Sequence, residues 1–212
     1  MEKLVTTPAP NLPQPTPQYS AAYQGALLNV LRLFFNLIAD TLRGLTGTRG
    51  GQYINNAYGA FQNNADVVLT AANTAEAIPL PVEDFVNGMA VGGGGGGIQV
   101  SVSGLYNLQF SLQFANTDTA IHAAVVWLRK NSTDVPGTAS KFDVPSKHGA
   151  SDGYLIGACN FYVDLLAGES VELWWAAGST AVYIEAYPAQ TTPFARPTIP
   201  SAVATLTFVS SI

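Results

Sequence analysis

The stretch IQVSVSGLYNLQFSLQF, residues 98–114, decides the fold of this chain. Apolar side chains recur in it at every second position, at Ile98, Val100, Val102, Leu108, Phe110, Leu112 and Phe114. A period of two is typical of β-strands that bury one face and expose the other. The stretch therefore predicts two half-buried antiparallel strands.

Similar short apolar segments follow along the chain, separated by clusters of Gly, Pro, Asn and Asp. The further strand candidates are residues 66–71, 75–80, 120–130, 154–164, 169–176, 181–187 and 202–210. Many short strands with no helix between them are typical of a sandwich or jelly roll. We expect a mainly β protein whose antiparallel jelly-roll sandwich, the head domain, covers residues 63–212.

The first 20 residues form a separate region, because they carry Pro8, Pro10, Pro13, Pro15 and Pro17. Proline removes backbone donors and favours the extended polyproline II conformation. We interpret residues 1–20 as an extended arm that anchors the chain on another protein's surface. A tail that binds nothing is the alternative.

Residues 21–46 have the pattern of one amphipathic helix, with Ser20 as its cap. A heptad seam runs along it at Leu28, Leu31, Phe35, Ile38, Leu42 and Leu45. A second apolar stripe at Leu27, Val30, Phe34 and Leu37 widens the apolar face. This width favours association with other helices or proteins, and packing on the chain's own head is the alternative. Residues 47–62, rich in Gly and Asn, are expected to be a linker.

Composition narrows the classes of partner. Only 11% of the residues are charged and 48% are hydrophobic, which favours an oligomer that covers the excess apolar surface. With a net charge of −5 and no basic run, nucleic-acid binding is not expected. Polar residues interrupt the helix at Asn29, Arg32, Asn36 and Asp40, so we expect no membrane span. The first 20 residues lack the apolar segment of a secretory signal, so we expect synthesis in the cytosol.

Residues 120–128 are apolar on both alternating faces, which predicts a strand between the core and a neighbouring subunit. Aromatic clusters in two later strands extend this apolar surface. The predicted trimer interface of the head consists of Ala124, Val126, Leu128, Trp174, Trp175, Tyr183 and Tyr187.

The order of motifs in the last 150 residues resembles the tumour necrosis factor and complement globular-head superfamily. The similar pieces are GLYNLQFSLQF at 104–114, VVWLRKN at 125–131, YLIGACNFYVDLLAGESVELWW at 154–175 and ATLTFV at 204–209. The region of resemblance covers about two thirds of the chain. The resemblance implies a compact jelly roll that associates as a homotrimer.

A head of this kind behind a Pro-rich arm and a short helix is similar to virion proteins of tailed bacteriophages. This similarity implies a trimer on a virion, attached to capsid or tail proteins through residues 1–46. The sequence does not decide between head and tail, or between reinforcing the particle and binding a host-surface glycan or receptor. A free soluble trimeric recognition module, lectin-like or cytokine-like, is the alternative.

Catalytic and cofactor signals are weak. His122, His148 and Cys159 lack the flanking signature of an activated nucleophile, and one cysteine cannot form an intrachain disulfide. The glycines at 92–97 precede a strand, whereas a phosphate-binding loop precedes a helix. Acidic residues at Glu83, Asp84, Asp118, Asp134, Asp143 and Asp152 lack a calcium-loop spacing. We expect no enzyme activity, no metal and no cofactor.

Overall fold

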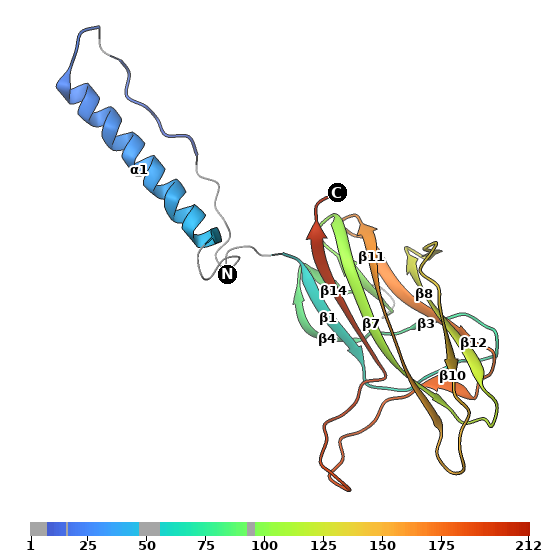
Figure 1. The fold of residues 1–212 in the computed structure, drawn as a ribbon. Coiled ribbons are helices and arrows are strands. Elements are labelled where there is room, and N and C mark those ends of the chain that lie inside the picture. The colour runs from blue at the N-terminus through green and yellow to red at the C-terminus, as the bar shows by residue number, and fades with distance from the viewer. Residues whose placement is uncertain (1–7, 16, 47–55, 93–95) are drawn as a thin grey trace. The chain divides into compact units, whose positions relative to one another are not determined.

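The computed structural model describes residues 8–15, 17–46, 56–92 and 96–212. The chain divides into two compact units, residues 1–55 and 56–212 (Figure 1). The first contains a single helix among its described residues, and the second contains two antiparallel sheets. The predicted class, a mainly β sandwich preceded by an arm and one helix, is confirmed.

Helix α1 spans Ala21–Thr46, as predicted. Ser20 caps it, because the backbone N–H of Tyr23 donates to the Ser20 hydroxyl at 3.2 Å. The described part of the Pro-rich arm runs beside this helix (Figure 1), and Pro8 and Pro10 line one groove with Val30 and Phe34. The arm and the second apolar stripe of its own helix therefore line the same groove.

The first sheet, sheet A, has seven strands. They are β1 (Tyr58–Asn63), β2 (Val67–Val68), β4 (Val82–Asn87), β7 (Gly104–Asn116), β11 (Gly153–Leu165), β13 (Val182–Ile184) and β14 (Ala202–Ser210). Strands β11, β7, β14, β1 and β4 lie side by side in that order, and β13 and β2 extend the sheet beyond the start of β14.

Sheet B also has seven strands and packs on sheet A. They are β3 (Glu76–Ile78), β5 (Met89–Val91), β6 (Gly97–Val100), β8 (His122–Lys130), β9 (Thr133–Asp134), β10 (Ser140–Val144) and β12 (Ser170–Ala177). Alternate side chains of both sheets form one core, which includes Phe61, Tyr106, Phe114, Leu128 and Trp175. The period of two in residues 98–114 thus places one side chain of each pair in the core.

The predicted linker, residues 47–62, was wrong at its C-terminal end. Residues 58–63 form β1, which pairs with both β4 and β14 and is therefore an interior strand. The head begins at Asn56 rather than at residue 63. The rest of the predicted linker, residues 47–55, lies outside the described residues.

The head has two distinguishable ends along the strands of sheet A. The chain enters it next to Tyr58, which lies opposite Thr207 of β14, and we call this end proximal. At the other, distal end, Tyr154 of β11 and Tyr183 of β13 flank Ala115 of β7. A long loop between β13 and β14 extends from the distal end (Figure 1).

Candidate functional site: the two outer faces of the sandwich

The outward side chains of β7, β11 and β14 form what we call face A. The registers align them in rows across the sheet. One row joins Tyr162, Asn107, Thr207 and Tyr58, and the next joins Asn160, Gln109, Thr205 and Ala60. Face A is thus a continuous surface over the proximal half of the sheet.

Face A is almost without charge. Among the outward positions of its three strands, Asp164 is the one charged side chain, and Lys130 of β8 pairs with it at 3.1 Å. The other polar side chains are Asn107, Gln109, Ser111, Gln113, Asn160, Thr205 and Thr207. Depletion of charge is the compositional signal of the core of a protein interface.

Exposed apolar side chains lie at both edges of the same sheet. At one edge Tyr162 of β11 is 65% exposed, and at the other Phe85 of β4 is 73% exposed. A cyclic trimer needs two different patches on each subunit, because each contact joins one patch to the other patch of the next copy. The two edges of sheet A provide such a pair.

The outward side chains of β8, β10 and β12 form face B, which combines apolar side chains with more charged groups than face A. The apolar ones are Ala123, Val125, Trp127, Trp174 and Ala176. The Arg129 guanidinium lies 3.7 Å above the Trp174 ring, and its Nε donates to Asp134 at 2.6 Å. The indole N–H of Trp127 donates to the same carboxylate, and Lys141 pairs with Asp143 at 3.2 Å. Charged groups with partners are suited to a face that meets water.

The structure corrects the predicted trimer interface of the head. Ala124, Val126, Leu128 and Trp175 are fully buried in the core of one chain, so they cannot contact another subunit. Both faces of residues 120–128 are apolar, and the prediction chose the inward one. Trp174 lies half-buried on face B, whereas Tyr183 and Tyr187 lie half-buried at the distal end of sheet A. The seven residues therefore do not form one surface.

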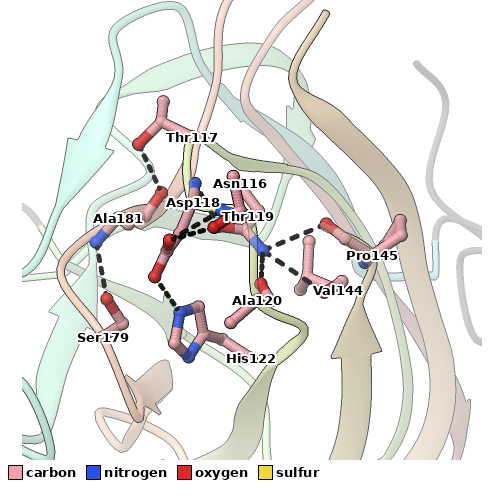
Figure 2. Close-up of polar contacts among 10 residues, drawn as sticks. All are labelled: Asn116, Thr117, Asp118, Thr119, Ala120, His122, Val144, Pro145, Ser179 and Ala181. Atoms are coloured by element: carbon pink, nitrogen blue, oxygen red, sulfur yellow. Dashed lines mark hydrogen bonds and ion pairs between the residues drawn. The ribbon is translucent and has the colours of Figure 1, made fainter. Parts of the chain in front are cut away.

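The side chain of Asn116 connects two loops at the distal end through hydrogen bonds (Figure 2). Its buried amide N–H group donates to the carbonyl oxygens of Ala120 at 2.8 Å and Pro145 at 3.0 Å. Its side-chain oxygen accepts from the backbone of Asp118, which lies 2.8 Å from the His122 ring. The hydrogen bond from His122 is the main reason why the pKa of Asp118 is lowered. One side chain thus joins the loops after β7 and β10.

Two tyrosines and a glutamate form a second distal cluster. The Tyr187 hydroxyl donates to Glu185 at 2.5 Å. Burial, followed by the nearby Glu185 and Asp152 carboxylates, raises the pKa of Tyr183 to about 12. Burial and the Glu185 hydrogen bond also raise the pKa of Tyr187 well above its ordinary value. Both phenols therefore remain neutral at physiological pH.

The heptad seam of α1 is largely exposed. Leu28, Phe35 and Leu42 are 66%, 61% and 52% exposed, while Leu31 and Ile38 are half-buried. The side chain of Leu45 lies outside the described residues. The arm lies on the second stripe, so three seam positions one heptad apart are open to another protein.

By length and composition alone, Ala21–Arg43 could cross a membrane. Buried core helices of proteins outside membranes meet the same criterion. The expectation that the chain does not span a membrane stays a prediction.

The three residues considered as catalytic candidates each contact a different residue. His122 contacts Asp118, His148 forms a backbone bridge with Ser151, and the Cys159 sulfur lies 3.3 Å from the Ser140 hydroxyl. No hydrogen bond joins Cys159 to either histidine in the part of the chain that the structure describes. The absence of enzyme activity stays a prediction.

The glycine run at 92–97 follows β5 and ends at Gly97, the first residue of β6, so it leads into a strand as predicted. Its residues 93–95 lie outside the described residues. Of the acidic side chains, Asp118, Asp134 and Asp143 pair with basic groups. Within the described ranges, no three His, Cys, Asp or Glu side chains are grouped so that they could hold a metal ion.

Comparisons with known proteins do not assign the chain to a family. No protein-family model and no curated protein matches the sequence of the chain. The resemblance to trimeric heads and to phage virion proteins therefore stays a prediction.

Sequence reasoning missed the residues of face A. Tyr162 and Phe85 were not predicted as interface residues, and β4 was not predicted as a strand. A signal was present in residues 107–113, where the outward positions are Asn107, Gln109, Ser111 and Gln113 without a charge. The charge composition of a polar alternation, and not only its period, therefore distinguishes face A from face B.

Proposed function

We propose that this chain is a structural virion protein of a tailed bacteriophage. It forms a homotrimer through the proximal half of face A and attaches to the capsid or tail through residues 1–46. Its head is displayed outward, with the distal end available to a host surface. The observation that carries the self-association is the nearly uncharged face A, with exposed Tyr162 at one edge of sheet A and exposed Phe85, next to Asp84 of β4, at the other.

The separate N-terminal unit supports attachment. Helix α1 exposes Leu28, Phe35 and Leu42 one heptad apart, and the arm already covers part of its other apolar stripe. An apolar helical seam of this kind fits a groove or bundle supplied by a partner protein. Attachment by one unit leaves the other free for display.

The test places charges on the seam. The double variant Phe35→Asp/Ile38→Asp puts two carboxylates where apolar contacts are expected, at a cost of several kcal/mol if they are buried. The matched control, Asn29→Asp/Asn36→Asp, adds the same charges to the opposite helix face. We expect the seam variant to keep the circular dichroism and trimer mass of the wild type but to be absent from purified particles, as counted by quantitative mass spectrometry.

Normal incorporation of the seam variant would contradict attachment by α1. A wild-type protein that is trimeric in solution but absent from particles would contradict the virion role. That result would favour the alternative, a free recognition module.

A further inference from the structure

A groove of about 340 Å³ opens at the distal end of sheet A. It lies between β11 and the hairpin that follows β13. Its lining residues are Gln113, Phe114, Tyr154, Leu155, Ile156 and Tyr187. Its volume is at the lower end of the range of small-ligand sites.

Aromatic rings form the walls of this groove. Tyr154 is 53% exposed, and its ring centroid lies 6.4 Å from that of Tyr187 with the planes at 62°. The Arg196 guanidinium lies 5.4 Å from the centre of the Tyr187 ring, and the carbonyl of Pro188 holds it at 2.9 Å. The groove is therefore lined by aromatic surface, and Arg196 lies next to it on the Tyr187 ring.

The hairpin that carries Tyr187 is braced. Backbone hydrogen bonds of 2.9 Å join Tyr187 and Ile199 in both directions, and Gln190 and Arg196 form a second such pair farther along. At its base the Glu185 N–H donates to the Gln113 carbonyl at 2.7 Å. A preformed groove loses little conformational entropy when a ligand binds.

Polar groups beside the rings can bind hydroxyl groups. The Glu185 carboxylate already orients the Tyr187 hydroxyl, and Asp152 lies near enough to affect Tyr183. The side-chain amide of Gln113 makes no hydrogen bond with any residue that the structure describes. Carboxylate and amide groups next to a ring face suit a ligand with one apolar face and a rim of hydroxyls.

Two other ligand classes fit less well. A cationic ligand would compete with Arg196, whose guanidinium already lies over the Tyr187 ring. An anionic ligand would meet the Glu185 and Asp152 carboxylates at this end of the sheet. A neutral sugar ring has the required apolar C–H face and hydroxyl rim.

We infer that the groove lined by the adjacent Tyr154 and Tyr187 rings binds a neutral hexopyranose unit of a cell-surface glycan. This inference rests on the proposed display of the head, because the groove lies at the end opposite to the point where the chain enters it. In a trimer, three such grooves would raise a weak affinity per site through avidity.

The experiment uses the full-length protein and ligand-observed saturation-transfer NMR. The probes are the methyl glycosides of glucose, galactose, mannose and N-acetylglucosamine, with choline as a cationic competitor. The variants Tyr154→Ala and Glu185→Gln alter the groove. Phe194→Ala is the matched control, because Phe194 is 64% exposed and does not line the groove.

We expect saturation transfer to at least one glycoside with the wild type and with Phe194→Ala. Affinity should fall about tenfold or more in Tyr154→Ala, which is the typical loss for an aromatic anchor. Because Tyr154 is exposed, unchanged circular dichroism is expected, and Glu185→Gln provides a second test that keeps the side-chain size.

Three results would overturn the inference: no transfer to any glycoside, transfer that Tyr154→Ala leaves unchanged, or displacement of the glycoside by choline. Copies per purified particle are measured separately. A protein that is incorporated but binds no glycoside contradicts the groove alone, whereas one that binds a glycoside but is absent from particles supports the groove and contradicts the virion role.

Discussion

Face A and face B are outer surfaces of the same sandwich, but their chemistry differs. Face B carries Arg129, Glu172, Lys141 and Asp143, and its charged groups have partners. Face A carries amides, hydroxyls and exposed apolar groups, with one charge at its margin. Burying an amide or hydroxyl against a hydrogen-bonding partner costs little, whereas burying a charge costs several kcal/mol. The difference favours face A over face B as the surface of the proposed trimer contact.

The largest difference in stability is expected between substitutions of two adjacent tryptophans in β12, which point to opposite faces of sheet B. Trp175 is fully buried and touches the Phe114 ring, whereas Trp174 lies outward under Arg129. We expect Trp175→Ala to lower the free energy of unfolding by about 3–5 kcal/mol. Trp174→Ala should lower it by about 1–2 kcal/mol, from lost packing and the cation–π contact.

Urea denaturation of the two variants, followed by tryptophan fluorescence and circular dichroism, measures this difference. Equal losses would contradict the assignment of the two side chains to opposite faces. A loss of oligomer mass in Trp174→Ala would show that face B also takes part in association.

A smaller effect is expected in how the melting temperature of variants on the two faces depends on pH. Hydrogen bonds from Arg129 and Trp127 hold the pKa of Asp134 below its ordinary value of 3.8. A carboxylate with a depressed folded-state pKa stabilises the fold above its unfolded pKa, and this contribution disappears as the pH falls through the folded value. The difference in melting temperature between wild type and Asp134→Asn should therefore be present at neutral pH and vanish in strong acid.

The corresponding control is Thr207→Val on face A, whose effect on melting temperature should not change with pH because no charged group is involved. A pH-independent difference for Asp134→Asn would mean that the carboxylate adds nothing to the stability of face B.

Much of the fold follows from sequence periodicity. The strands around residues 98–114, helix α1 and its Ser20 cap were predicted because each depends on local pattern. Strands β4 and β10 were missed because edge strands carry charged residues such as Asp84 and Lys141 that obscure the alternation. β1 was missed because Gly59 and its neighbours resemble a loop.

The sites depend on contacts between distant residues. Residues 120–128 are apolar on both faces. The sequence therefore predicts a strand there but does not indicate which set of side chains points into the core. Tyr154 and Tyr187 lie 33 positions apart in sequence and meet only because β11 and β13 flank β7. Sequence pattern could not join them, since the topology of the sheet decides which strands are neighbours.

The most direct test of association through face A places one negative charge on each face. Thr205→Asp changes the proximal half of face A, and Ala176→Asp changes β12 on face B. Light scattering of the full-length proteins gives their masses, and circular dichroism checks that both fold. If face A holds the trimer together, the wild type and Ala176→Asp are trimers and Thr205→Asp is a folded monomer. A wild type that is monomeric at micromolar concentration, or a Thr205→Asp variant that remains trimeric, would contradict this association.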